Sequence, residues 1–311
     1  MARANRDGHS GVVSEPQPAA ATPIKSQTLN RASEARPGKR RSAQLSLSSK
    51  WSSFCGRSAQ RLIEPRFTAL QDNDVWVKSP GEVVTIADEE AERSLARRLE
   101  DLLPGTPVVG EEASSQDPRL LSCLLEDRAW LVDPLDGTAN FAAGGADWAV
   151  MVALVERGTT VASWIWRPGP DQVMYSAELG QGATRNGVPI RRTQPVPPIS
   201  EMRGVVLTRF LDPVTSNLVA ANRDRYGSVS SGRLCAGVDY PALIEGGQKF
   251  VLFWRTLPWD HAPGALLLSE SGGVACRLDG TPYGPTQQTS GLLAAATQDA
   301  WDAVRASLLG P

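Results

Sequence analysis

The sequence predicts a mixed fold, with an α+β first half and an α/β second half. Three patterns support this prediction: an amphipathic helix over residues 88–102, successive strands over 148–177, and alternating strands and helices beyond residue 204. Strands joined by short turns are typical of an antiparallel meander. Strands that alternate with helices indicate a layered arrangement in which helices cover a sheet.

Apolar spacing and prolines mark the first helices and strands of the chain. Residues 51–71 predict a helix that Pro65 interrupts, and residues 83–86 predict an extended segment. Asp88 is then predicted to open a helix whose apolar positions recur every third or fourth residue. Pro104 and the glycine after it are predicted to end that helix.

Two short apolar strands end in carboxylates. Residues 107–110 lead into Glu111, and residues 130–132 lead into Asp133. Because proline has no amide hydrogen, Pro134 is predicted to end the second strand. Further strands are predicted at 148–155, 161–166, 172–177, 204–208 and 274–278, and further helices at 214–222, 236–245, 261–271 and 298–308.

Composition limits the chemistry that the protein can perform. The 311 residues include 32 lysines and arginines against 34 aspartates and glutamates, a net charge of −2, and 41% are hydrophobic. This composition predicts neither nucleic acid nor a membrane as a partner. The two histidines, His9 and His261, exclude zinc sites of the HExxH and three-histidine types, so carboxylates are expected to perform any catalysis.

The sequence predicts a cytoplasmic protein with three parts. The four cysteines form no CxxC pair, no apolar run is long enough to span a bilayer, and no secretory signal is recognisable. Residues 1–50 contain no aromatic residue and nine basic against three acidic residues, which predicts disorder, with a transit peptide as the alternative. The remainder, with 23 basic and 31 acidic residues and thus a net charge of −8, divides into residues 51–180 and 181–311.

The densest group of chemically useful residues is the run Asp133-Pro134-Leu135-Asp136-Gly137-Thr138-Ala139-Asn140-Phe141. Asp133 and Asp136 are expected to converge with Glu111 from a neighbouring strand end, and carboxylate oxygens are ligands that Mg²⁺ prefers. The amides of Gly137 and Thr138, at a predicted helix N-terminus, can bind phosphate oxygens. The alternative interpretation is a polar turn in which an aspartate caps a helix.

This run resembles the DPxDGTxNF pattern of the inositol monophosphatase family, a family of Mg²⁺-dependent, lithium-sensitive phosphatases. A second family element, Trp-Asp before a helix and a Gly-Gly, is matched by Pro258-Trp259-Asp260 and by Gly272-Gly273. Shorter landmarks are also matched: Lys78, Val84-Thr85-Ile86-Ala87-Asp88, Gly110-Glu111-Glu112, Gly182-Ala183 and Asn186-Gly187. The resemblance covers residues 51–311.

The resemblance implies a layered α/β/α/β/α sandwich, of the inositol monophosphatase and fructose-1,6-bisphosphatase type, and a homodimer. It implies hydrolysis of a small phosphate monoester by water activated on two or three Mg²⁺ ions. The implied metal ligands are Glu111, Asp133, the carbonyl of Leu135, Asp136, Asp260 and, for a weaker ion held through water, Asp88. Glu111, Thr138 and Asp88 form the implied catalytic group, in which Asp88 pairs with the Thr138 hydroxyl. The implied phosphate and substrate contacts are Lys78, Asp136, Gly137, Thr138, Ala236, Arg255 and Asp260.

Other interpretations stay open for single residues. Asp88 and Asp260 can each be a helix N-cap, and Glu111 can be a solvated strand end. Lys78 either neutralises phosphate or covers its loop. His261, at a helix start, either contacts the substrate or is structural, and we expect the structural role.

The sequence departs from the family pattern where the alcohol part of the substrate would bind. Residues 251–257 contain no carboxylate, whereas members that use inositol phosphates have an acidic residue there, and Leu234 stands where a glycine is expected. Arg255 suits a more anionic substrate. Inositol phosphate, histidinol phosphate, a 3′-phosphonucleotide and a sugar bisphosphate stay open as substrates. The alternative of another class is a catalytically weak, metal-binding regulatory homologue, which the complete set of implied metal ligands disfavours.

Overall fold

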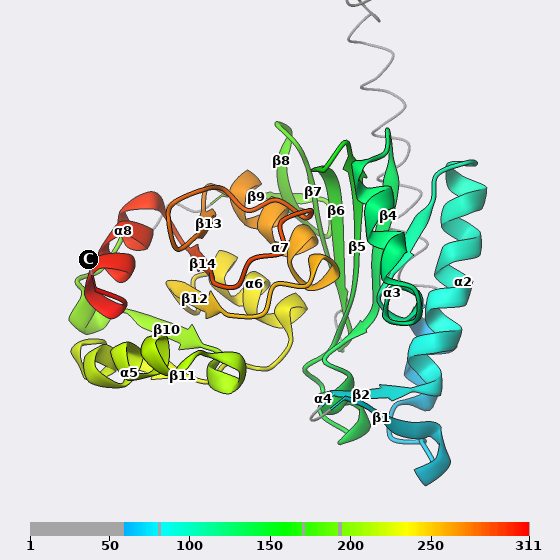
Figure 1. The fold of residues 1–311 in the computed structure, drawn as a ribbon, viewed down its shortest axis with the longest axis horizontal. Coiled ribbons are helices and arrows are strands. Elements are labelled where there is room, and N and C mark those ends of the chain that lie inside the picture. Colours follow the sequence, from blue (N-terminus) through cyan, green and yellow to red (C-terminus); the bar gives the residue numbers. More distant parts are fainter. Residues whose placement is uncertain (1–58, 80–81, 170–171, 192–194, 311) are drawn as a thin grey trace, which may run out of the picture. The chain divides into compact units, whose positions relative to one another are not determined.

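The computed structural model describes residues 59–79, 82–169, 172–191 and 195–310. The extension predicted over 1–50, and the start of the helix predicted over 51–71, lie outside these residues. In the described part, helices and sheets alternate in five layers, in the order helix, sheet, helix, sheet, helix (Figure 1). This order confirms the α/β/α/β/α sandwich that the resemblance implied.

The first sheet of the described residues has seven strands, in the order β3-β4-β5-β6-β7-β8-β9. β3 and β4 are parallel and all later neighbours are antiparallel, which confirms the predicted meander. The strands are β3 (Val108–Gly110), β4 (Ala129–Asp136), β5 (Ala149–Glu156), β6 (Thr159–Arg167), β7 (Val173–Glu178), β8 (Gly182–Arg185) and β9 (Val188–Ile190). The boundary predicted after residue 180 falls in the turn between β7 and β8, and the division of the chain there stays a prediction.

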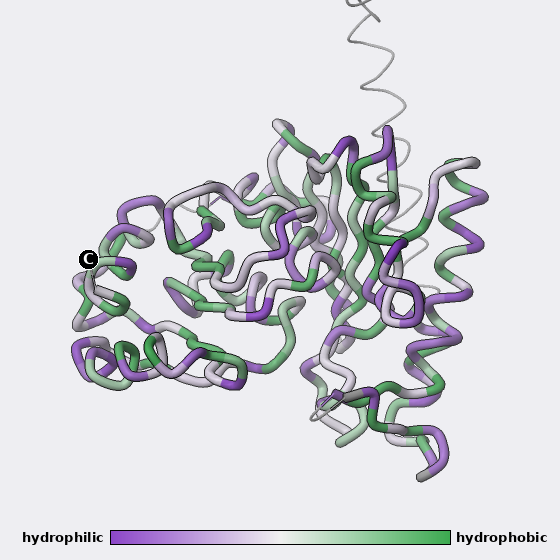
Figure 2. Tube along the Cα trace, viewed as in Figure 1, coloured by the Kyte–Doolittle hydropathy of each residue, from purple (hydrophilic) through white to green (hydrophobic). Residues whose placement is uncertain are grey.

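Helix α2 (Ile86–Leu102) covers the outer face of this sheet. Its buried Leu95 and Leu99 belong to the same core cluster as tryptophans of β4 and β6. Figure 2 shows the resulting contrast, with hydrophobic central strands beside a helix that is largely hydrophilic away from the sheet. The helix begins before Asp88 because Thr85 is its N-cap, so the prediction that Asp88 opens the helix is wrong.

The middle layer consists of α6 (Ala236–Ile244) and α7 (Pro258–Glu270), whose apolar side chains share one core cluster with residues of both sheets. Helix α7 begins three residues before the predicted start at 261. Pro258 fits the first helical position, where the backbone amide would have no partner within the helix. Asp260 therefore lies inside the first turn of α7.

The second sheet of the described residues has five strands, in the order β11-β10-β12-β14-β13. β11, β10 and β12 are parallel, whereas β14 is antiparallel to both of its neighbours. The strands are β10 (Arg203–Val206), β11 (Ser228–Ser230), β12 (Phe250–Phe253), β13 (Val274–Arg277) and β14 (Leu292–Ala295). Helices α5 (Pro213–Asn222) and α8 (Gln298–Leu308) form the last layer on its far face.

Short elements connect these layers. They are the hairpin of β1 (Val75–Ser79) and β2 (Glu82–Thr85), the helices α3 (Glu111–Gln116) and α4 (Thr138–Ala142), and the 3-10 turns η1 (Glu64–Arg66), η2 (Asp72–Asp74), η3 (Pro118–Leu125), η4 (Ile199–Glu201), η5 (Thr208–Phe210) and η6 (Arg223–Arg225). None of the helices in the described ranges combines the length and the apolar character that a bilayer crossing requires. The sequence does not predict β8, β9, β11, β12 or β14, which are strands of three or four residues and too short for apolar periodicity alone to identify them.

The substitution Gly264→Ala tests the contact between α6 and α7. At an unconstrained helix position this change would stabilise the protein, because alanine has the higher helix propensity. Here an added Cβ would lie 2.1 Å from the ring of Tyr240, which is completely buried. The overpacking is expected to lower the free energy of unfolding by about 1–3 kcal/mol, measured by urea denaturation.

The matched control for Gly264→Ala is Ser269→Ala, at an exposed position of the same helix. It is expected to change the free energy of unfolding by less than about 0.5 kcal/mol. A gain of stability in Gly264→Ala would contradict the tight contact between the two helices.

Candidate active site

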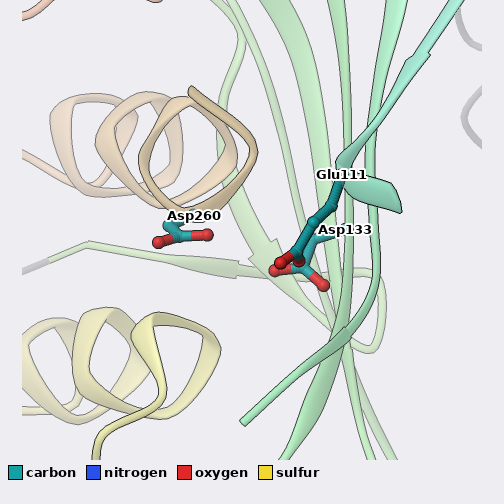
Figure 3. Close-up of side chains that lie close together, drawn as sticks. All are labelled: Glu111, Asp133 and Asp260. Carbon is teal, nitrogen blue, oxygen red and sulfur yellow. The ribbon is translucent and has the colours of Figure 1, made fainter. Parts of the chain in front are cut away.

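Two carboxylates meet because β3 and β4 are parallel neighbours. Glu111 is the first residue after the carboxyl end of β3, and Asp133 lies near the carboxyl end of β4. The carboxyl ends of parallel strands meet at one edge of a sheet, which is where ligands bind in open α/β sheets. The acidic groups of Glu111 and Asp133 therefore lie side by side, as Figure 3 shows.

A bulge in β4 brings a third carboxylate to the same face. Asp133 is opposite Met151 and Asp136 is opposite Ala149, so three steps along β4 match two along β5. In a regular strand Asp133 and Asp136 would point to opposite faces, but the extra residue returns Asp136 to the face of Asp133. Pro134 lies inside β4, and the prediction that it ends the strand is wrong, because residues of a bulge need no ladder hydrogen bond.

Asp260 approaches these carboxylates from the middle layer. Leu257 is the N-cap of α7, so the alternative interpretation of Asp260 as an N-cap is wrong. One carboxylate oxygen each of Glu111, Asp133 and Asp260 lies within 4.8 Å of the other two. Figure 3 shows the three side chains converging from the edge of the seven-stranded sheet and from α7.

Burial and mutual repulsion make full ionisation of this acidic cluster unfavourable. Burial is the largest cause in each case, and it raises the pKa of Asp136 to about 6 and the pKa of Asp260 to about 7. The pKa values of Glu111 and Asp133 are also raised well above their ordinary range, first by burial and then by the neighbouring carboxylates. A cation among these oxygens would relieve both effects.

The N-terminus of α6 holds the Asp136 carboxylate in place. Its Oδ2 atom accepts a hydrogen bond from the Gly237 amide at 2.6 Å and one from the Cys235 thiol at 3.2 Å. An added Cβ at Gly237 would lie 2.4 Å from the Cβ of Ala149, so a glycine is needed for α6 to approach β5 this closely. These contacts fix the orientation of the Asp136 carboxylate.

Asp88 links the start of α2 to the acidic segment of β4. Thr85 and Asp88 form a capping box, in which Asp88 Oδ2 accepts hydrogen bonds from the Thr85 amide at 2.8 Å and the Thr85 hydroxyl at 2.6 Å. Asp88 Oδ1 lies 2.9 Å from the Thr138 hydroxyl, so the pair that the resemblance implied is present. That hydroxyl is also 2.9 Å from the Leu135 carbonyl oxygen, and its single hydrogen serves one acceptor at a time. Burial raises the pKa of Asp88 to about 6.

Lys78 brings positive charge beside Glu111. Its Nζ atom lies 3.3 Å from Glu111 Oε1 and 2.9 Å from Glu112 Oε2. Burial alone would lower the pKa of Lys78, but the two carboxylates outweigh it and raise that pKa, so the amine is charged at neutral pH. Glu112 is therefore a partner of Lys78 and does not join the acidic cluster.

One cleft collects the predicted site residues. Its lining includes Lys78, Glu111, Asp133, Leu135, Asp136, Gly137, Thr138, Ala236, Arg255 and Asp260. Asp88 is outside this lining and reaches the cleft through Thr138. Gly137 has a φ of 85°, and an added Cβ there would lie 2.6 Å from the carbonyl oxygen of Asp147, so the turn before α4 requires glycine.

His261 makes contacts that fit its expected structural role. Its Nε2 atom lies 3.0 Å from the carbonyl oxygen of Arg255, and its Nδ1 atom lies 3.3 Å from the Tyr240 hydroxyl. Burial lowers the pKa of His261 to about 3, so the imidazole is neutral at physiological pH. General acid catalysis by this histidine is therefore disfavoured, in agreement with the expectation that carboxylates perform the chemistry.

The lining of the cleft also contains Glu82, Arg209, Phe210 and Trp254, which the sequence prediction does not assign to the site. We call Glu82, Arg209, Phe210, Leu234, Trp254 and Arg255 the rim; all of them line the cleft. The guanidinium groups of Arg209 and Arg255 lie 5.0 Å and 4.6 Å from the centroid of the Phe210 ring. Arg255 also forms an ion pair with Glu82 of β2. Arg209 and Phe210 come just after the predicted strand 204–208, and this position is the signal that could have found them.

The backbone at Leu234 has a conformation that suits glycine. Its φ is 54°, a left-handed conformation that costs a residue with a side chain roughly 1–2 kcal/mol. The side chain is 52% exposed and lines the cleft. The glycine expected from the resemblance would relieve this strain and remove apolar surface from the rim.

The donor set of the acidic cluster fits a hard divalent cation. Glu111, Asp133 and Asp260 offer oxygen ligands, and Asp136 is close enough to raise the pKa of Asp133. Carboxylate oxygen, carbonyl oxygen and water are the ligands that Mg²⁺ prefers. Burial raises the pKa of the nearby Cys235 thiol well above its usual value, so that sulfur stays protonated and is a poor metal ligand.

Comparison with known proteins agrees with this arrangement. A family model described as the inositol monophosphatase family matches residues 54–309. The chain belongs to the inositol monophosphatase family. This is a family of metal-dependent phosphatases, and the acidic cluster of this member is a possible metal-binding site.

Individual relatives carry different names. An inositol-1-monophosphatase of Mesorhizobium japonicum is 30% identical over 244 residues, which are 77% of this chain and 87% of that protein. A protein of Neisseria meningitidis named a putative Nus factor SuhB is 26% identical over 205 residues, 65% of this chain and 76% of that protein. The solved structure of an inositol monophosphatase of Thermotoga maritima has a TM-score of 0.70 at 22% identity and shares the fold over 84% of this chain and 96% of that chain.

Removal of divalent cations is expected to make the stability of this family member depend strongly on pH. The pKa values of Asp136 and Asp260 are higher in the folded protein than the ordinary value of an unfolded chain. The protonated carboxyl groups of Asp136 and Asp260 therefore add to the free energy of unfolding. This contribution is complete below about pH 4 and is lost as the pH rises through about 6 to 7. We expect the melting temperature of chelator-treated protein to fall between about pH 5 and about pH 8, and added Mg²⁺ to raise it most at the higher pH.

The variant Asp260→Asn tests how much one carboxylate destabilises the metal-free protein. At about pH 8 it is expected to raise the melting temperature of the metal-free protein by about 2–4 °C for each kcal/mol of repulsion removed, and to weaken the effect of Mg²⁺. Asp224→Asn, at an exposed position of η6, is the matched control and is expected to change neither quantity. A lower metal-free melting temperature in Asp260→Asn would contradict the repulsion.

Proposed function

We propose that the protein hydrolyses a small phosphate monoester in a reaction that depends on Mg²⁺. The observation that carries this proposal is the convergence of Glu111, Asp133 and Asp260 within 4.8 Å in the lining of one cleft. Membership of a phosphatase family supports the same chemistry. The donor set, which consists of oxygen atoms, supports Mg²⁺ as the cation.

The acidic cluster needs a cation before it can accept a phosphate. Carboxylates at this spacing repel a phosphate dianion as well as one another. Two or three Mg²⁺ ions held by Glu111, Asp133, the Leu135 carbonyl, Asp136 and Asp260, with Asp88 acting through water, would neutralise phosphate charge and activate a water molecule. Lys78 contributes a fixed positive charge at the same end of the cleft.

Glu111 and Thr138 are the residues proposed to position the attacking water. The Thr138 hydroxyl donates its hydrogen to Asp88 or to the Leu135 carbonyl, so its lone pairs are left to accept a hydrogen bond from water. The water oxygen attacks phosphorus, the bond from phosphorus to the alcohol oxygen breaks, and the alcohol leaves with a proton. Asp88 is thus proposed to act by orienting Thr138.

Phosphate and alcohol are proposed to bind at different parts of the cleft. The backbone of Gly137 and Thr138, with Lys78, is proposed to hold phosphate oxygens, close to Asp136 and Asp260. Ala236 and Arg255 are proposed to contact the rest of the substrate. Inositol phosphate, histidinol phosphate, a 3′-phosphonucleotide and a sugar bisphosphate are the candidate substrates. The proposal further includes inhibition by Li⁺ and a cytoplasmic homodimer that needs neither nucleic acid nor membrane as a partner.

A regulatory role is the second candidate function. The observation that favours it is the similarity to the protein of Neisseria meningitidis that is named a putative Nus factor SuhB. In such a role the acidic cluster would bind a metal without appreciable turnover. Release of phosphate by the purified wild-type protein, with and without Mg²⁺, distinguishes the two candidates.

The variants Glu111→Gln and Asp133→Asn test the proposed reaction. Each removes one charged ligand, and metal ions stabilise the charge of the transition state by several kcal/mol. We expect each variant to lower the Mg²⁺-dependent kcat/KM for phosphate release by roughly a hundredfold or more. Phosphate release from a panel of phosphate esters is the measurement.

Glu126→Gln, at an exposed position away from the cleft lining, is the matched control and is expected to keep the wild-type rate. Circular dichroism of each variant checks that the fold is retained. Near-wild-type rates in both Glu111→Gln and Asp133→Asn would overturn the assignment of the acidic cluster as the catalytic centre.

A further inference from the structure

Helix α3 lacks the cap that a helix normally takes from its own N-cap residue. That residue is Gly110, which has no side chain to accept hydrogen bonds from the free amides of the first turn. Glu92 of α2 provides the acceptors instead. Its Oε2 atom accepts a hydrogen bond from the Glu112 amide at 2.8 Å, and its Oε1 atom accepts one from the Ala113 amide at 2.9 Å. Both oxygens of one carboxylate therefore hold the first turn of α3.

Gly110 leaves the space that this carboxylate occupies. An added Cβ at Gly110 would have the Cδ, Oε2 and Oε1 atoms of Glu92 as its three nearest neighbours, at 2.3, 2.4 and 2.6 Å. The φ of Gly110 is −94°, which any residue can adopt, so the carboxylate and not the backbone conformation requires glycine here. Glu92 is 8% exposed and does not line the cleft, so it does not contact a molecule bound there.

Glu111 depends on this contact for its position. It is the first residue of α3, and it lies between Gly110 and the Glu112 amide that Glu92 holds. Helix α3 has six residues, and a helix this short forms only where other parts of the chain fix its ends. Lys78 contacts the Glu111 carboxylate at 3.3 Å. The backbone of Glu111 is thus fixed by Glu92, and its carboxylate is held by Lys78.

Asp88 and Glu92 lie one turn apart on α2 and hold two different parts of the site. Asp88 contacts the Thr138 hydroxyl at 2.9 Å. Glu92 holds the turn that begins with Glu111. Both carboxylates are buried, on a helix that is anchored in the core of the seven-stranded sheet. Helix α2 therefore fixes the relative positions of Thr138 and Glu111, the two residues proposed to position the attacking water.

We propose that Glu92 is a positioning residue, which sets the place of Glu111 in the acidic cluster and thereby the affinity of this cluster for a divalent cation. Glu92 acts through the amides of Glu112 and Ala113, and it contacts neither the cation nor the substrate. This inference rests on the Mg²⁺ binding of the proposed function. Loss of the two hydrogen bonds loosens Glu111 without removing any metal ligand.

The variant Glu92→Gln tests this role. It keeps the size of the side chain but leaves one acceptor oxygen, and its NH2 group faces an amide that needs an acceptor. Hydrogen exchange of the metal-free protein is expected to be faster at the Glu112 and Ala113 amides. Calorimetric titration with Mg²⁺ is expected to show binding about tenfold weaker than in the wild type, because groups that orient metal ligands contribute roughly 10–100-fold to metal affinity.

The matched control is Glu270→Gln, because Glu270 holds two backbone amides in the same way. Its Oε1 and Oε2 atoms accept hydrogen bonds from the Gly180 and Gly182 amides at 2.8 and 2.7 Å, outside the cleft lining. This variant removes an equivalent pair of hydrogen bonds at the end of α7, and it is expected to leave the affinity for Mg²⁺ unchanged. If Glu92 is merely structural, Glu92→Gln also leaves that affinity unchanged, and the inference is overturned.

The variant Gly110→Ala separates the effect of position from the effect of charge. Glu92→Gln also removes a negative charge near the acidic cluster, and that loss alone would weaken cation binding. The methyl group added by Gly110→Ala displaces the flexible end of Glu92 from the two amides and keeps its charge. We expect Mg²⁺ binding to weaken by about tenfold here too. Weaker binding in Glu92→Gln together with wild-type affinity in Gly110→Ala would assign the effect to charge and overturn the inference.

The outcomes distinguish this inference from the proposed function. Mg²⁺ binding and phosphate release by the wild-type protein, with unchanged Mg²⁺ affinity in Glu92→Gln, overturn the inference and leave the phosphatase function supported. Absence of Mg²⁺ binding to the wild-type protein overturns both. Weaker Mg²⁺ binding in both Glu92→Gln and Gly110→Ala, with wild-type affinity in Glu270→Gln, supports the inference.

Discussion

Repulsion among the carboxylates of Glu111, Asp133 and Asp260 is the constraint on which the rest of the structure depends. One oxygen of each lies within 4.8 Å of the others, in surroundings that raise the pKa of all three. Buried charges without partners cost several kcal/mol each, so the chain must hold these groups by its architecture. Lys78 compensates part of the charge, and a divalent cation would compensate the remainder.

The two sheets position different parts of the cleft lining. Parallel pairing of β3 with β4 and the bulge in β4 place Glu111, Asp133 and Asp136, while the middle layer adds Asp260. Segments that follow the parallel strands of the second sheet place most of the rim, and Glu82 of β2 completes it. This division would allow the proposed substrate contacts to change while the acidic cluster is kept.

The sequence predicted the residues of the acidic cluster better than the backbone features that position them. The run that contains Asp133 and Asp136 identifies the site, but the bulge depends on pairing with β5, which the local sequence does not encode. Thr85 and Asp88 are both capping residue types, and only the backbone of α2 shows which is the N-cap. Phe210 could not be placed beside Arg255, because the order of β10 and β12 in the sheet becomes clear only in the folded chain.

Proton release during Mg²⁺ binding tests most directly whether a cation relieves this repulsion. Calorimetric titration of metal-free protein at about pH 6.5, in two buffers that differ in ionisation enthalpy, measures the protons released for each bound ion. Because the pKa of Asp260 is raised to about 7 and that of Asp136 to about 6, we expect saturable Mg²⁺ binding with net proton release that declines toward higher pH. Absence of Mg²⁺ binding, or binding without proton release, would contradict it.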